Sequence, residues 1–120
     1  MIEYIFSPGS PKPRGPYTPA VRAGDFIYVA GQAVVGADVK AETRQILTNI
    51  RAVLEAAGAS LADVVRCGVF LIDGDDFQSM NEAYAEMFGE TRPARTTIVV
   101  AGLPLKDAKV EIDAIAYKPR

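Results

Sequence analysis

Apolar residues recur at helical spacing in two segments of the chain. Residues 39–57 carry an apolar stripe on one side, which predicts an amphipathic helix. Asp38 stands at its N-cap position, and Gly58 is placed to end it in a left-handed conformation. Residues 77–88 carry a second stripe and predict a second helix, which Gly89 ends. The two stripes consist of Ile46, Ile50, Val53, Leu54 and Ala57, and of Phe77, Met80, Tyr84, Met87 and Phe88.

Strand patterns occupy most of the remaining chain. Residues 64–72 are rich in β-branched residues and apolar on both faces, which predicts a central strand covered on both sides. Five prolines fall in residues 7–19, so we expect a loop there rather than a strand. Further strands are predicted at residues 2–6, 20–22, 26–30, 95–102 and 109–117, with Ala23-Gly24-Asp25 as an antiparallel turn between the second and third of them.

This order of elements predicts a single α+β domain over residues 1–120, with two helices on one face of a mixed sheet. Strict alternation along the central strand places Val65, Cys67, Val69 and Leu71 on one of its faces. Two helices can cover only one apolar face, and the chain offers no further helix for the other. A second copy of the chain is the simplest cover, so we expect a homo-oligomer.

Composition narrows the possible chemistry. The chain has 120 residues, a formal net charge of -2, one cysteine and no histidine. These counts exclude a Ser-His or Cys-His catalytic pair, an internal disulfide and a structural zinc cluster. They also give no reason to expect a nucleic-acid partner through bulk charge. An enzyme built from this chain would move protons with Asp, Glu, Tyr, Lys, backbone groups or water.

The chain shows neither of two membrane-related patterns. Its first residues lack the basic segment followed by an apolar stretch that a signal peptide requires. No apolar run approaches the roughly 20 residues that span a bilayer. We therefore expect a cytoplasmic protein with no membrane partner.

Charged residues near the C-terminus are the first candidates for chemistry. Glu111 and Asp113 lie on one side of the last predicted strand, about 7 Å apart. They are either part of a solvated face or a general acid/base whose pKa burial raises. Arg95 opens the preceding strand after Pro93-Ala94 and is either a surface charge or a clamp on a carboxylate or phosphate.

Three further residues are considered for a structural or a functional role. Tyr17 lies in the stiff Gly-Pro-Tyr-Thr-Pro loop, where it either packs in the fold or caps a substrate. Gly31 ends a strand and suits a close backbone approach. Cys67 has apolar neighbours in mid-strand and is expected to be a buried small hydrophobe rather than a nucleophile.

Four segments carry a resemblance over nearly the whole chain. They are GPYTPAVRAGDFIYVAGQ (15–32), TRQILTNIRAVLEAAGASLADVVRCGVFL (43–71), NEAYAEMFGE (81–90) and PARTTIVVAGLPLKDAKVEIDAIA (93–116). In this order they resemble the RidA (YjgF/YER057c/UK114) family. The resemblance implies a chorismate-mutase-like fold and a homotrimer with clefts between subunits. It also implies hydrolysis of reactive 2-enamines or 2-imines, such as 2-aminoacrylate, to 2-keto acids and ammonia, with no cofactor or metal.

The same resemblance implies roles for individual residues. Arg95 would bind the carboxylate of a small 2-imino or 2-keto acid, and Glu111 would activate water and manage protons. The cleft would also be lined by Tyr17, Gly31, Asn81 and Thr97. The family often has serine where this chain has Ala30 and cysteine where it has Thr97. A trimeric small-ligand-binding or chaperone-like stress protein without turnover is therefore the alternative, whereas the ribonuclease activity of some animal relatives is disfavoured by the missing histidine.

Overall fold

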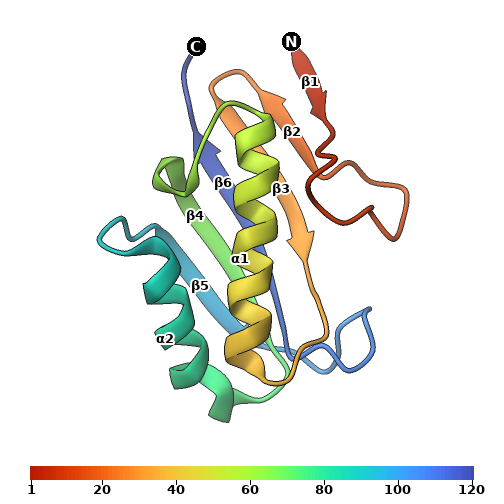
Figure 1. Ribbon diagram of the computed structural model, residues 1–120, viewed down its shortest axis with the longest axis vertical. Helices are drawn as coiled ribbons and strands as arrows, with labels where there is room; N and C mark the ends of the chain where they lie inside the picture. The colour runs from red at the N-terminus through yellow and green to blue at the C-terminus, as the bar shows by residue number, and fades with distance from the viewer.

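A computed structural model describes residues 1–120 and shows one mixed sheet with both α-helices on the same face (Figure 1). The strand order is β1-β2-β3-β6-β4-β5, with β4 and β5 parallel and every other neighbouring pair antiparallel. The strands are β1 (Ile2–Ile5), β2 (Ala20–Ala23), β3 (Phe26–Gln32), β4 (Val64–Leu71), β5 (Ala94–Val99) and β6 (Val110–Tyr117); the helices are α1 (Val39–Ala56) and α2 (Phe77–Phe88). The predicted single-domain α+β fold is confirmed.

Both helices begin and end close to the predicted residues. The Asp38 side chain accepts a hydrogen bond from the Ala41 amide at 2.8 Å, which caps the start of α1. Gly58 and Gly89 follow the two helices with φ angles of +80° and +62°, where a side chain would be strained. Two short 3-10 turns, Leu61–Asp63 and Gly74–Asp76, were not predicted as helical.

Two strand boundaries differ from the prediction by more than one residue. β3 continues to Gln32 rather than ending at residue 30. β5 ends at Val99 rather than at residue 102, because its only partner strand, β4, ends at Leu71.

The predicted alternation along β4 is wrong at its start. Val64 pairs with Ala116 and Arg66 pairs with Ile115, so β4 contains one extra residue at this point. Val65 is therefore turned outward and is 44% exposed, whereas Val64 is buried among core residues. From Cys67 onward the prediction holds, because the bulge lies before that residue.

The core lies between the helices and one face of the sheet, and the other face has no cover in this chain. On β6 the side chains alternate between these faces, with Val110, Ile112, Ala114 and Ala116 buried in the core. We call the opposite side the open face; among its apolar residues Tyr4, Tyr28 and Ile98 are exposed and Phe70 and Ile115 are half-buried. Neither helix is long and apolar enough to cross a membrane.

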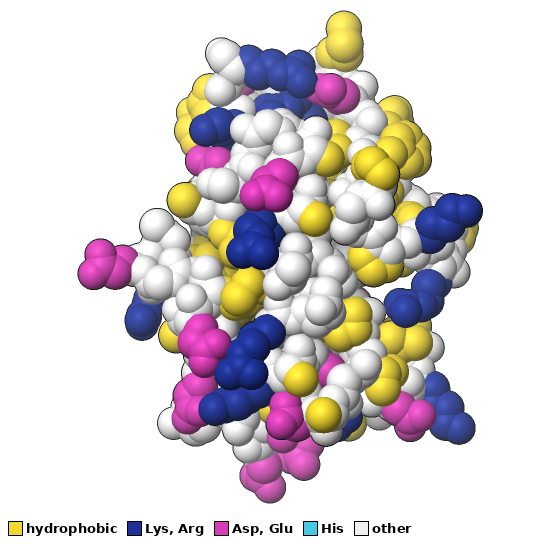
Figure 2. All heavy atoms as spheres, viewed as in Figure 1, with side chains coloured by type: hydrophobic (Ala, Val, Ile, Leu, Met, Phe, Trp, Pro, Cys, Tyr) yellow, Lys and Arg dark blue, Asp and Glu magenta, His cyan; other side chains and the backbone are white.

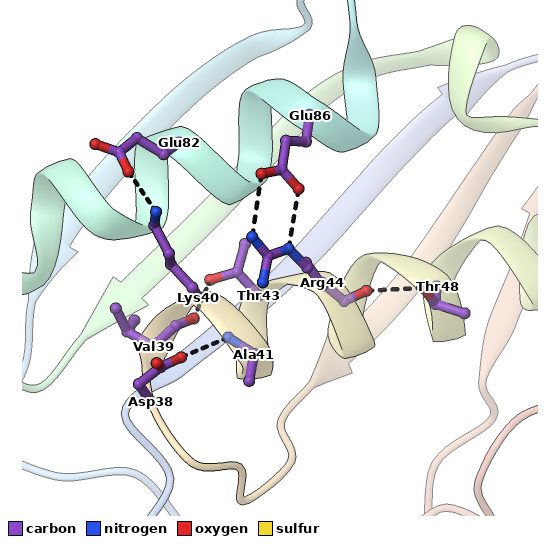
Figure 3. A network of polar contacts seen from close by, with 9 residues as sticks. All are labelled: Asp38, Val39, Lys40, Ala41, Thr43, Arg44, Thr48, Glu82 and Glu86. Carbon is purple, nitrogen blue, oxygen red and sulfur yellow. Dashed lines mark hydrogen bonds and ion pairs between the residues drawn. The ribbon is translucent and has the colours of Figure 1, made fainter.

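Surface ion pairs join the two helices. Arg44 of α1 binds Glu86 of α2 through two hydrogen bonds of 2.9 and 3.1 Å, and Lys40 pairs with Glu82 one turn away (Figure 3). The hydrogen bond and the charge of Arg44 lower the pKa of Glu86. Over this helix layer, acidic and basic side chains lie beside one another (Figure 2).

A buried carboxylate, that of Glu42, connects the start of α1 to two neighbouring segments of the chain. Glu42 of α1 is fully buried and accepts hydrogen bonds from the amides of Gly36 and Lys109, at 3.2 and 2.7 Å. The Lys109 ammonium lies 3.1 Å from the same carboxylate and balances its charge. Glu42 thus joins the connection before α1 to the start of β6.

We predict that Glu42→Ala lowers the free energy of unfolding by about 3 kcal/mol, because two amides and an ammonium lose a charged acceptor. Glu82→Ala is the matched control, since it also removes a glutamate that pairs with a lysine, but an exposed one. Both variants are compared with the wild-type protein by urea unfolding at one protein concentration. Equal unfolding midpoints for the two variants would contradict the assigned role.

Candidate functional site

The first candidate site is a hollow that contains Glu111. Its volume is about 450 Å³, which is enough for a small carboxylic acid. It is lined by Arg14, Tyr17, Ala30, Gly31, Ala33, Pro104, Leu105 and Glu111. Three residues singled out from the sequence, Tyr17, Gly31 and Glu111, are therefore together in the structure.

Glu111 packs directly on the backbone of Gly31. A Cβ atom at Gly31 would lie 2.6 Å from the Glu111 Oε2 atom, so the carboxylate would have to leave its present position if residue 31 had a side chain. The pairing of β3 with β6 shifts register between Val29 and Gln32, which places this glycine in an irregular part of the strand. The glycine at position 31 thus permits the close approach of the Glu111 carboxylate.

The two carboxylates of β6 have different surroundings. Asp113 accepts a hydrogen bond of 2.8 Å from the Gly68 amide, and a Cβ at Gly68 would lie 2.6 Å from the Asp113 Oδ1 atom. Glu111 receives no hydrogen bond from the protein, and burial, followed by the charge of Asp113, raises its pKa. The Asp113 carboxylate thus joins β6 to β4, whereas the Glu111 carboxylate has no hydrogen bond to the chain and remains available to a ligand or a proton.

The proline-rich loop brings Tyr17 to this hollow. The Tyr17 hydroxyl accepts a hydrogen bond from the Arg14 amide at 3.3 Å, and the Arg14 Nη1 atom donates to the Ala33 carbonyl at 3.3 Å. These contacts tie the loop to the end of β3, where Gly31 lies. Arg14 was not expected at the site, because its position in a loop gave no pattern to recognise.

A second hollow lies along the edge strand β5 and contains Arg95. Asn81 of α2 lines the same hollow, so this predicted pair is also brought together. No carboxylate pairs with Arg95, whose guanidinium instead faces aromatic rings of α2. Asn81 uses its Nδ2 atom to bind Gln78, but its Oδ1 atom is buried without a partner.

Thr97 lies two residues after Arg95 and faces the same side of β5. Its hydroxyl is also buried without a hydrogen-bond partner. Two buried polar atoms, Asn81 Oδ1 and Thr97 Oγ1, therefore lack a hydrogen-bond partner, and of these two residues Asn81 lines the Arg95 hollow. Buried polar atoms are normally hydrogen-bonded, so both are candidates for contact with a bound ligand or water.

Arg95 and Glu111 point to opposite sides of the sheet within one protomer. Arg95 pairs with Cys67, which is buried beneath the helices, whereas Glu111 pairs with Phe70 on the open face. The two residues that we expected to act together therefore occupy separate hollows of a single chain.

Two other sequence interpretations can be compared with the structure. Cys67 is fully buried and burial raises the pKa of its thiol, which fits a small core residue rather than a nucleophile. No cluster of three or more Cys, Asp or Glu side chains has an arrangement that could hold a metal ion.

Comparison with known proteins identifies the family. The sequence model of the Endoribonuclease L-PSP family matches residues 8–118. A RutC family protein of Pyrococcus horikoshii is 52% identical, over 98% of this chain and 99% of the relative. A 2-iminobutanoate/2-iminopropanoate deaminase of Escherichia coli is 41% identical, over 98% and 99% of the two chains.

The fold agrees with this match. The crystal structure of the YjgF gene product of Escherichia coli superposes with a TM-score of 0.90 at 40% identity, covering 96% of this chain and 98% of the other. The resemblance inferred from the sequence motifs is confirmed. The chain therefore belongs to the Endoribonuclease L-PSP family, in which the YjgF and RidA proteins are its relatives.

Proposed function

We propose that this protein hydrolyses reactive 2-imino acids and their enamine forms, such as 2-aminoacrylate, to 2-keto acids and ammonia. Relatives about 40% identical carry the name 2-iminobutanoate/2-iminopropanoate deaminase, which supports this reaction class. The observation that carries the proposal is a complementary pair of unsatisfied groups. Arg95 is a cation without an acidic partner, and Glu111 is a half-buried carboxylate without a hydrogen-bond donor.

The complete site forms between two copies of the chain. Within one copy, Arg95 and Glu111 lie on opposite sides of the sheet, so one substrate molecule cannot contact both. The open face also leaves apolar residues such as Tyr28 and Ile98 exposed, and a second copy would cover them. A cyclic homotrimer satisfies both requirements, because it gives each subunit one neighbour for its Arg95 hollow and another for its Glu111 hollow.

The reaction follows from these positions. Arg95 binds the substrate carboxylate through its planar guanidinium and fixes the imine carbon near Glu111. Glu111 takes a proton from water as the water oxygen bonds to that carbon, and it returns a proton to the nitrogen. In the resulting carbinolamine, Glu111 transfers the hydroxyl proton to the amino nitrogen. The carbon–nitrogen bond then breaks as the carbonyl forms, ammonia leaves and the 2-keto acid remains. An imine is already electrophilic, so positioning and proton transfer are sufficient and no cofactor takes part.

The remaining residues orient the substrate. The Asn81 Oδ1 atom is an acceptor for the N–H of the imine, and the Thr97 hydroxyl is a donor to the carboxylate. Tyr17 closes the Glu111 hollow, and Gly31 leaves space beside the reacting carboxylate. The family often has serine at position 30, whereas Ala30 carries no hydroxyl. The side chain of residue 30 therefore gives the substrate no hydrogen bond.

The second candidate function is ligand binding without turnover, as in a trimeric stress protein. It is favoured by Ala30, which contributes no polar group to the hollow. The proposed enzyme accelerates the hydrolysis of a 2-imino acid above the rate in buffer, whereas a binder holds a 2-keto acid without acceleration. Assay of both properties on the same purified protein separates the two functions.

Arg95→Ala should abolish the acceleration of 2-iminobutanoate hydrolysis, because the substrate carboxylate loses its cation. Arg95→Lys should retain charge but lose bidentate geometry, so it should recover only part of the activity. The imine is generated by an amino-acid oxidase, and the fraction that survives is trapped with semicarbazide. If Arg95→Ala keeps the wild-type rate, the assigned carboxylate site is wrong.

The raised pKa of Glu111 predicts a pH effect of its neighbour Asp113. Glu111 acts as a base only when ionised, so activity falls as the pH drops through its pKa. Asp113→Asn removes the nearby negative charge while keeping an oxygen for the Gly68 amide. The pKa of Glu111 should therefore decrease, and the acidic limb of the rate profile should move to lower pH. Rates are taken above the buffer rate at each pH, and an unmoved limb would rule out Glu111 as the titrating base.

Mixing two inactive variants tests whether neighbouring subunits share the site. Arg95→Ala and Glu111→Gln subunits, unfolded together and refolded, should recover about one quarter of the wild-type activity, because half of the subunits supply each intact residue. Native mass spectrometry confirms that mixed oligomers have formed. Mixed oligomers without activity would place the complete site within one chain.

A further inference from the structure

Arg95 is held by neutral groups rather than by an acid. Its Cζ atom lies 4.8 Å from the centre of the Tyr84 ring and 5.6 Å from the centre of the Phe77 ring. The Arg95 Nη1 atom lies 3.9 Å from the sulfur of Met80. No Asp or Glu of this chain forms an ion pair with it, although the chain has fifteen acidic residues.

The three contacting residues come from one stripe of α2. Phe77, Met80 and Tyr84 are separated by three and four positions, so they lie on the same side of the helix. Met80 and Tyr84 are buried, as is typical of the apolar stripe of an amphipathic helix. Phe77 is 41% exposed, however, so the stripe extends beyond the core and ends over the guanidinium.

An aromatic support has a different electrostatic effect from that of a carboxylate. The negative face of a ring attracts a cation but carries no net charge. A bound Asp or Glu would neutralise Arg95 and would compete with the carboxylate of a ligand. Burial raises the pKa of the Tyr84 hydroxyl, while the positive charge of Arg95 opposes that rise.

The hydroxyl of Tyr84 is not part of this contact. It is buried and lies beside the Cys67 thiol, in the core. The face of the ring, rather than the oxygen, is therefore what Arg95 meets.

We propose that Tyr84 is a positioning residue whose ring, assisted by Phe77 and Met80, holds the Arg95 guanidinium in place for a carboxylate ligand. This inference rests on the proposed function, since it concerns the group that binds the substrate carboxylate. α2 carries all three supporting residues, and the ion pairs Lys40–Glu82 and Arg44–Glu86 join it to α1 (Figure 3). The supported cation then loses little conformational freedom when the ligand binds.

Three variants of the full-length protein separate the ring from the hydroxyl. Tyr84→Phe keeps the ring and removes only the oxygen, whereas Tyr84→Leu removes the ring. Phe77→Leu removes the more distant ring from an exposed position, where the fold tolerates the change. Binding of 2-oxobutanoate is measured by calorimetry, and hydrolysis of 2-iminobutanoate gives KM and kcat. Thermal unfolding and oligomeric state are measured for every variant.

Tyr84→Leu should raise the Kd for 2-oxobutanoate and the KM about threefold to tenfold, while kcat changes less than about twofold. Tyr84→Phe should match the wild type in both constants, and Phe77→Leu should raise them about twofold. Equal losses in Tyr84→Phe and Tyr84→Leu would overturn the proposal, because the hydroxyl would then be responsible. The proposal would also be overturned if both Tyr84→Leu and Phe77→Leu left the Kd and the KM unchanged.

The outcome is independent of whether the wild type turns over an imine. If the wild type binds 2-oxobutanoate but gives no acceleration, the proposed deaminase activity fails, and the Kd values still test the support of Arg95. If Tyr84→Leu does not fold, a Phe77→Leu Kd equal to that of the wild type overturns the proposal, and an increased Kd supports it.

Discussion

The alternation of side chains along the central strand β6 is the constraint on which the rest of the structure depends. This strand pairs with β3 on one side and with β4 on the other, so its orientation sets that of both neighbours. Its even-numbered residues form the floor of the core beneath the helices. Its odd-numbered residues Glu111 and Asp113 must therefore face away from the core. The position of Glu111, the proposed reactive carboxylate, is thus a consequence of how the core is filled.

Two glycines make that arrangement possible. Each carboxylate of β6 lies over a glycine of a neighbouring strand, Glu111 over Gly31 and Asp113 over Gly68, at distances that exclude a Cβ atom. The difference between the two pairs is one hydrogen bond, which Gly68 donates to Asp113. Two similar acids on one strand consequently differ in role, because the backbone binds one of them and leaves the other for solvent or a ligand.

The charged groups of the site remain unsatisfied within one protomer. Arg95 is attracted by ring faces and a sulfur atom, and Glu111 accepts no hydrogen bond from the chain and has the like charge of Asp113 nearby. A small molecule with a carboxylate and an electrophilic carbon would satisfy both groups if two subunits met across them. A chain without histidine fits such chemistry. Hydrolysis of a reactive imine needs only that the substrate carboxylate is held in place and that one acidic side chain transfers protons.

The sequence by itself determined the element types, both helix ends, the single α+β domain and the family. Helical and alternating periodicities are local properties, and Asp38, Gly58 and Gly89 mark boundaries through local backbone chemistry. It also named Tyr17, Gly31, Asn81, Arg95, Thr97 and Glu111, but only the resemblance of the motifs connected them.

Only the tertiary structure decided how these residues are grouped. The bulge at Val65 depends on pairing with β6, and no periodicity within β4 reveals it. The separation of Arg95 from Glu111 depends on strand order and on which face the helices cover. The different surroundings of Glu111 and Asp113 depend on glycines far away in the chain. Contacts between distant segments are set by packing, and the sequence around each residue does not contain that information.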